Sequence, residues 1–345
     1  MRVRPRLPLI PGVAALSIAV TPAPARADGC EPPSGVSPCI DANSLWLAPG
    51  EAHFFSIAPA RPLGNRRAAF GFGTSFLDRP VRLHAASPDP EGRFINVVRY
   101  ALDSTLLLSI GVMPRLELNA TLANLRVQSG SGVEGYTSQN GPPLSPTAVR
   151  DPRLGAGFSL IDDRRLGFAA KPRLEFSLPL GEQDKLAGEA SFVAAPSLAL
   201  ELKRGRLLLG SEIGLRLREV SDFAGTRLGS QATIALGAGF DVLDRGLLAV
   251  LAEGWLMPSL ASSDHDLPDG TKVRDVLLAP AEWQFSVRSE LVESLALQLG
   301  GGTALPLSSE RRIAPDGSSE TEHFAGITAA RFRVNLVVRY VPGKT

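Results

Sequence analysis

Cysteine, histidine and aromatic residues are scarce in this chain, and its net charge is close to zero. The 345 residues include two cysteines, four histidines and 6% aromatic residues, and 36 basic against 35 acidic side chains leave a formal net charge of +1. Such a balance provides no electrostatic footprint for nucleic acid, so we expect no nucleic-acid partner. No Cys and His residues stand at the spacing of a zinc site, and we expect neither a metal nor another cofactor.

Long apolar runs are also missing. Three arginines precede a short apolar stretch at residues 11–20, and an A-x-A cleavage motif ends at Ala27. This order is typical of a secretory signal peptide, which we assign to residues 1–27. A transmembrane anchor is the alternative, but the apolar stretch is shorter than the roughly 20 residues that a spanning helix needs. No later stretch could span as a helix, so the exported chain is predicted to be periplasmic, secreted or an outer-membrane barrel.

The two cysteines, Cys30 and Cys39, both fall in the Pro-rich segment at residues 28–65. In an oxidising compartment they favour a small disulfide loop. A lipid-attachment cysteine would need a Leu-rich box directly before it, which Cys30 lacks, and free thiols are the remaining alternative. We interpret residues 28–65 as a periplasmic N-terminal segment that lies against the following domain or inside it.

The clearest pattern is a two-residue alternation at residues 331–340. One face carries Phe332, Val334, Leu336, Val338 and Tyr340, and the other carries Arg331, Arg333, Asn335 and Arg339. Successive side chains of a β-strand point to opposite sides, so this is a strand with one apolar and one charged face. A soluble sheet over a core and a membrane barrel with a polar lumen both produce such a strand.

Eleven more alternating runs precede it, beginning with one at residues 67–76. Their connections alternate between short breaks, such as 113–115 and 203–205, and long polar loops at 128–152, 261–280 and 308–324. This alternation of short and long connections is typical of an up-and-down outer-membrane barrel, whereas a soluble sandwich or lipocalin-like barrel does not require it. We therefore predict an all-β, transmembrane antiparallel up-and-down barrel of about 12 strands at residues 66–341, closed by pairing of the last strand with the first.

The charged residues of these strands are expected to point into the lumen, because an Arg or Lys facing lipid at mid-bilayer costs about 2–4 kcal/mol. The predicted lumen-lining residues are Lys171, Arg173, Glu175, Glu189, Glu201, Arg206, Glu212, Arg216, Arg218, Glu253, Glu282, Arg288, Glu290, Arg331, Arg333 and Arg339. Two functions remain open. The charges line a water-filled pore in a passive channel or transporter for small solutes, or they pair across the lumen and plug a structural, anchoring barrel.

Three stretches, at residues 109–118, 150–157 and 178–181, resemble the barrel domains of OmpA-like and transporter-like outer-membrane proteins. The resemblance covers residues 50–341 and is more specific for fold than for cargo. It implies the outer membrane of a Gram-negative bacterium and contact with its lipid. In many such proteins a peptidoglycan-binding domain follows the barrel, and we expect none here because the sequence stops at Thr345. The terminal strand, ending in Tyr340, is similar to the signal that the barrel-assembly machinery recognises, although five residues follow it.

No catalytic residue is predicted. Outer-membrane phospholipases are barrels of the same strand number, but His53, His84, His265 and His323 all fall outside the predicted strands, so no His–Ser pair is expected on one. The acidic residues around His265 could bind a cation weakly, and a solvated loop is the alternative. We therefore expect a protein that is not an enzyme.

Overall fold

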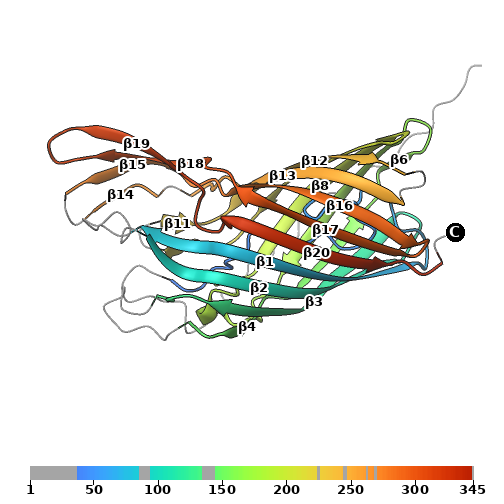
Figure 1. Ribbon diagram of the computed structural model, residues 1–345, viewed down its shortest axis with the longest axis horizontal. Helices are drawn as coiled ribbons and strands as arrows, with labels where there is room; N and C mark the ends of the chain where they lie inside the picture. The colour runs from blue at the N-terminus through green and yellow to red at the C-terminus, as the bar shows by residue number, and fades with distance from the viewer. Residues whose placement is uncertain are drawn as a thin grey trace, which may run out of the picture.

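The protein is an all-β closed barrel (Figure 1). The computed structural model describes residues 37–84, 94–133, 144–223, 226–243, 247–261, 263–267 and 270–343. Twelve antiparallel strands form the wall, in the order β1–β2–β3–β5–β7–β8–β9–β12–β13–β16–β17–β20 and back to β1. Among the described residues no helix is long and apolar enough to cross a membrane.

The wall strands match the predicted runs closely. They are β1 (Ala68–His84), β2 (Phe94–Gly111), β3 (Leu116–Ser129), β5 (Arg153–Phe158), β7 (Phe168–Ser177), β8 (Val193–Arg204), β9 (Leu207–Arg216), β12 (Gln231–Asp241), β13 (Leu248–Leu256), β16 (Ala281–Val292), β17 (Leu295–Ala304) and β20 (Phe332–Tyr340). Two short strands extend neighbouring ladders: β4 (Thr147–Val149) pairs with β3, and β6 (Ile161–Asp163) pairs with β7.

The barrel closes between its last and first strands, as predicted. β20 pairs with β1 from Phe70↔Tyr340 to Asp78↔Phe332, while β1 also pairs with β2. No wall strand is left with an unpaired edge, so the backbone groups of the wall are satisfied within the sheet.

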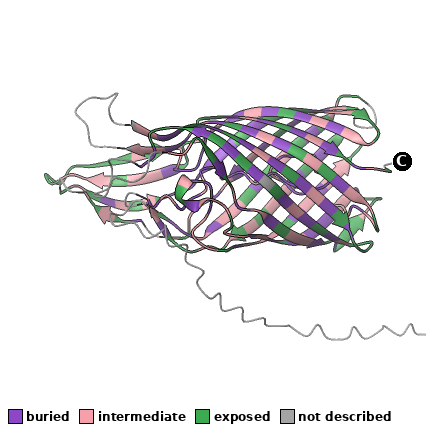
Figure 2. Ribbon diagram, turned by 90° about the horizontal axis from the view of Figure 1, so that it is seen from below, coloured by how far each residue is buried: buried purple, intermediate pink, exposed green. Residues whose placement is uncertain are grey.

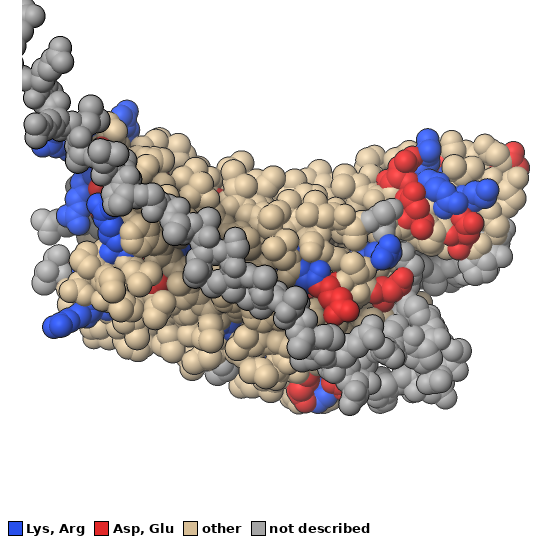
Figure 3. All heavy atoms as spheres, turned by 180° about the vertical axis from the view of Figure 1, so that it is seen from behind, with Lys and Arg blue, Asp and Glu red and all other residues tan. Residues whose placement is uncertain are grey.

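Side chains alternate between the two faces of the wall. On β20, Phe332, Leu336 and Tyr340 are exposed, whereas Arg333 and Asn335 are fully buried. The same alternation of buried and exposed residues runs along the other wall strands (Figure 2). On the face seen in Figure 3, charged side chains lie mostly toward the ends of the molecule, and a large part of the barrel surface between them is uncharged. This apolar outer face against a polar inner face is the pattern of a barrel in lipid.

In the described parts of the chain, the short connections lie at one end of the barrel and the long ones at the other, called here the short-turn end and the long-loop end. The long connections hold η2 (Gln183–Lys185), β10 (Ser221–Phe223), β11 (Thr226–Leu228), β14 (His265–Asp266), β15 (Lys272–Leu277), β18 (Ser308–Ile313) and β19 (Ser319–Phe324).

Residues 261–280 and 308–324 were expected to be loops, and that expectation is wrong in part. β14, β15, β18 and β19 form a separate four-stranded sheet, which projects beyond the barrel in Figure 1. The two connections pair with each other, from Lys272↔Ile313 to Leu277↔Ser309. Each connection also forms a hairpin of its own, β14 with β15 and β18 with β19. An isolated two-stranded hairpin is only marginally stable, which is why neither polar segment was recognised as strands by itself.

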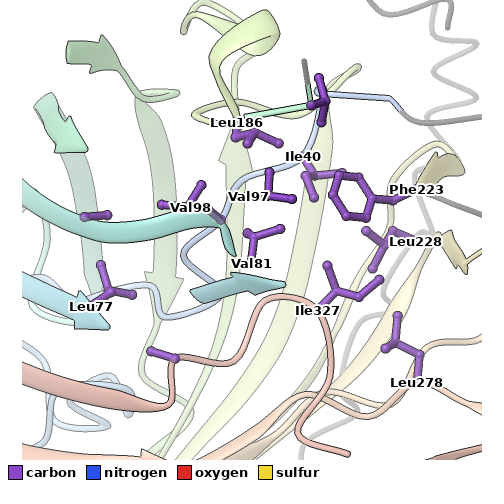
Figure 4. Packing of buried hydrophobic residues seen from close by; sticks show 14 residues of the cluster. Ile40, Leu77, Val81, Val97, Val98, Leu186, Phe223, Leu228, Leu278 and Ile327 are labelled. Atoms are coloured by element: carbon purple, nitrogen blue, oxygen red, sulfur yellow. The ribbon is translucent and has the colours of Figure 1, made fainter. Parts of the chain in front are cut away.

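An apolar cluster fills the mouth of the barrel at the long-loop end (Figure 4). It brings Val81 and Val97 of the wall against Leu186, Phe223 and other residues of the long connections. Ile40, from the segment before the first strand, packs into the same cluster and is 1% exposed. The chain therefore has a buried anchor here before its first wall strand begins.

Candidate functional site

The lumen is occupied by residues 37–65, called here the lumen segment. It forms no helix and no strand, and its only bridge is the isolated pair Asp41↔Ala187. The segment enters at the long-loop end, where the Ser37 N–H donates to the carbonyl of Asp222, and leaves at the short-turn end, where the Arg66 N–H donates to the carbonyl of Gly111. We expected a periplasmic segment that lies against the following domain or inside it; residues 37–65 lie inside the barrel. Irregular backbone is tolerated there because protein, not lipid, surrounds it.

At the long-loop end, Asp41 of the segment joins Arg126 of β3 and Arg150, which lies between β4 and β5. Its carboxylate lies 2.9 Å from Arg126 Nη2 and 2.6 Å from Arg150 Nη2. Asp103 of β2 completes the group, 2.6 Å from Arg126 Nε and 3.1 Å from Arg150 Nη1. Two carboxylates and two guanidinium groups thus balance one another in a buried site. Each of these charges has lost its hydration water, so the group is stable only because the four side chains lie at hydrogen-bonding distance from one another.

Asn43 extends this group from β2 to β20, the two strands that flank β1. Its Nδ2 donates to Asp103 at 2.7 Å, and its Oδ1 accepts from Arg333 Nη1 at 2.8 Å. Arg333 is fully buried and makes a bidentate pair with Glu282, at 2.6 and 2.8 Å. A single amide of the segment therefore links β2 to β20 on the inner side of the intervening strand β1.

Further along the lumen, wall carboxylates accept hydrogen bonds from the backbone of the segment. The Glu253 carboxylate accepts from the N–H groups of Phe55 and Ser56, at 2.8 and 2.9 Å, and from the Ser56 hydroxyl. Glu212 accepts from the Ala58 N–H at 2.7 Å. These charge-assisted bonds replace the ladder that residues 55–58 do not have.

Cationic and amide side chains of the wall donate hydrogen bonds to backbone carbonyls of the segment. Gln298 Nε2 donates to the carbonyl of His53 at 3.0 Å, and Arg339 Nη2 reaches the carbonyls of Ala48 and Phe54 at 3.4 Å. The polar inner face of the wall is thus a set of partners for an irregular backbone as well as a set of ion pairs.

At the short-turn end, Arg61 of the segment bonds to three wall groups. It donates to Glu201 at 3.0 Å, to Asp162 at 2.9 Å and to the carbonyl of Gly167 at 2.8 Å. Nearby, Lys171 Nζ lies 3.1 Å from Glu117, whose carboxylate also faces the Leu63 N–H at 3.4 Å. The segment is therefore fastened at both ends and along its middle.

Inward-facing glycines make room for the larger side chains of the segment. A Cβ on Gly210 or Gly237 would lie 2.7 or 2.6 Å from the ring of Phe54, and one on Gly300 would lie 2.8 Å from the ring of Phe55. Real Cβ atoms do not make contacts this short, so only glycine at these positions leaves room for the two phenylalanine rings. The fit indicates a built contact between the segment and the wall.

Most of the predicted lumen residues lie on the inner side of the structure. Those buried are Lys171, Arg173, Glu175, Glu201, Glu253, Glu282, Arg288, Arg333 and Arg339. Those partly buried are Glu189, Glu212, Arg216, Arg218 and Glu290. The lumen prediction is wrong for Arg206 and Arg331, which are exposed and lie just outside β9 and β20. Both precede the first residue of a strand, where the inward and outward alternation does not yet hold.

Sequence reasoning missed several members of the site. Asp103, Glu117, Arg126 and Arg153 are buried wall charges that were not among the predicted lumen residues. The signal was present, because each has at least one exposed apolar residue beside it, as Asp103 has Leu102. The ion pairs of Asp41 carried no such signal, since its segment has no periodicity.

The remaining sequence predictions concern the cysteines and histidines. Cys39 is buried and disulfide-bonded, whereas Cys30, like the signal peptide, lies outside the described residues, so the pairing stays a prediction. Three histidines lie in strands, contrary to expectation: His84 in β1, His265 in β14 and His323 in β19. Within the described ranges, no three His, Cys, Asp or Glu side chains group as metal ligands.

No family model matches the sequence, and no curated protein matches it. Solved structures do match the fold. An outer membrane channel from Pseudomonas putida F1 superposes with a TM-score of 0.50 at 10% identity, over 82% of this chain and 97% of that one. The NanC porin gives 0.43 at 7% identity, over 79% and 98% of the two chains. The outer membrane phospholipase A of Escherichia coli gives 0.34 at 12% identity, over 80% and 92%. The chain has the fold of an outer-membrane β-barrel.

Proposed function

We propose that this protein is a passive channel or transporter for small solutes in the outer membrane of a Gram-negative bacterium, and that the lumen segment holds it closed. The observation that carries the proposal is the way in which the segment is held. Side chains of the wall bind it at each level of the barrel, while no strand ladder joins it to the wall. Contacts of this kind break one at a time, so the segment can leave while the wall stays closed.

Such a channel would contact outer-membrane lipid and the barrel-assembly machinery. The uncharged part of the outer surface faces outer-membrane lipid, and the terminal strand ending in Tyr340 is the part that the barrel-assembly machinery would recognise. Kinship with OmpA-like and transporter-like barrels rests on the strand-and-turn stretches of the sequence. We infer no enzymatic activity, since the charges of the lumen bind the segment and one another.

A second candidate is a structural, anchoring barrel whose plug never moves. It is favoured by the ion pairs that wall residues make with one another, such as Arg333–Glu282 and Arg153–Glu175. Both candidates have the same closed state, and they differ in whether the segment can be displaced without loss of the barrel.

The test is to push the segment away from the wall with one methyl group. In Gly237→Ala, the new Cβ would stand 2.6 Å from the Phe54 ring and 2.9 Å from the Ile57 side chain. Gly254→Ala on the neighbouring strand is the matched control, because its Cβ would meet no atom closer than 3.4 Å. Purified proteins are compared in planar lipid bilayers, after native folding is shown by heat-modifiable mobility on a gel.

We expect discrete conductance steps from the wild type and the control, and steps at least several-fold more frequent from Gly237→Ala. Folded wild-type and Gly237→Ala proteins that both remain without conductance would overturn the channel and leave the structural barrel.

A further inference from the structure

A small cavity lies between the lumen segment and the wall. Its volume is about 80 Å³, and its lining includes Trp46 and Leu47 of the segment and Arg173, Arg216 and Trp255 of the wall. In the liquid, two or three water molecules fill this volume. The cavity is thus large enough for a small solute and is bounded on one side by the proposed plug.

The positive charges around this cavity outnumber the negative ones. Arg173 lies 2.9 Å from Glu212 and 3.2 Å from Glu175, and Glu175 also pairs with Arg153 at 3.0 Å. Arg216 is the third cation of the group, and the described residues offer it no carboxylate within ion-pair distance. Three guanidinium groups against two carboxylates leave one positive charge uncompensated in a largely enclosed site, and an anion would offset its desolvation.

The guanidinium group of Arg216 is held in place but has donors to spare. It stacks over the ring of Trp46, with 4.1 Å from Cζ to the ring centroid, and donates one hydrogen bond from Nη1 to the carbonyl of Ser44. Five N–H groups make up its planar fork, so most of them remain for a ligand. Stacking on Trp46 fixes the plane in which a ligand would have to lie.

Two further polar atoms on the cavity lining lack partners. Ser44 Oγ and Trp255 Nε1 are buried, and the described residues give neither a hydrogen bond. Buried polar groups are nearly always satisfied, so orphan atoms beside an unpaired arginine indicate a missing acceptor. The apolar part of the lining includes Leu45, Leu47 and Ala235.

We propose that this cavity binds a short-chain carboxylate of about two to four carbons. Its two oxygens match the planar fork of Arg216, and its alkyl end fits against the apolar part of the lining. The inference deepens the proposed function and rests on it for the part that the site plays in transport, where it identifies the solute class. Binding itself does not depend on conduction.

The test is ligand-observed NMR with sodium propionate and the folded, detergent-solubilised full chain. The wild type should broaden the propionate signals, and added butyrate should reverse this broadening by displacing propionate. Arg216→Gln should bind propionate with an affinity at least ten-fold lower. Arg206→Gln, at the exposed residue just before the same strand, is the matched control and should bind as the wild type does. Ala195→Leu should also lose binding, because it fills the cavity while leaving Arg216 in place.

Equal binding by the wild type and Arg216→Gln would overturn the site, as would full binding by Ala195→Leu. Displacement of propionate by chloride as efficiently as by butyrate would overturn the carboxylate assignment. Binding with no bilayer conductance would refute the channel but not the site, and conductance with no binding would refute the site but not the channel.

Discussion

The barrel wall and the lumen segment both run the length of the barrel, but their backbones are held differently. Each wall strand satisfies its N–H and C=O groups with its two neighbours. The segment has a single isolated bridge, and side chains such as Glu253 and Gln298 take the place of a ladder. The hydrogen bonds of a strand ladder open cooperatively, whereas side-chain hydrogen bonds open singly. The free energy of local opening should therefore be lower for the segment than for the wall.

The largest effect is expected where the wall pairs its own buried charges. Glu282→Leu leaves the fully buried Arg333 without its carboxylate, and removing one member of a buried pair costs about 3–5 kcal/mol. The free energy of unfolding, measured by urea titration in detergent micelles with tryptophan fluorescence, should fall by that amount.

The double variant Glu282→Leu/Arg333→Leu is the control for that experiment. It removes both charges and should recover much of the lost stability, because no charge remains buried alone. A single variant as stable as the wild type would show that water reaches Arg333, and that wall and segment are less different than proposed.

An intermediate effect is expected where the wall holds the segment. Glu253→Gln weakens the charge-assisted bonds to the Phe55 and Ser56 N–H groups, and hydrogen bonds to charged groups are worth about 1.5–3 kcal/mol. Hydrogen exchange followed by mass spectrometry should show amides 55 and 56 exchanging roughly ten- to hundred-fold faster, with the amides of β12 and β13 unchanged.

Glu189→Gln is the matched control, since that carboxylate pairs with Arg218 outside the segment. It should leave the exchange of residues 55 and 56 as it is. Faster exchange throughout β12 and β13 in Glu253→Gln would mean that segment and wall open together, which removes the distinction between them.

The smallest effect is expected in the projecting four-stranded sheet. Asp266→Asn removes the partner of Arg274, a pair 2.7 Å apart between two side chains that are 60% and 32% exposed. Exposed ion pairs contribute about 0–1 kcal/mol, so neither the unfolding free energy nor the exchange of the segment should change measurably. A larger loss would mean that this sheet supports the barrel.

The strands of the wall could be predicted because each one carries its own pattern. The alternation of Phe332 and Leu336 with Arg333 and Asn335 sets the two faces of β20 without reference to any neighbour. The buried charges Asp103 and Arg126 obey the same rule and could have been included. Arg206 and Arg331 could not be placed by it, because the rule ends with the strand.

The sequence by itself determined the barrel: period-2 strands, alternating connection lengths and closure of the last strand on the first. Only the tertiary structure decided what fills the lumen. Residues 37–65 have no periodicity, and their position depends on partners such as Glu253, Arg339 and Gly237 that lie far away in the chain. A local pattern reports the faces of its own strand, whereas a cavity is shaped by many strands at once.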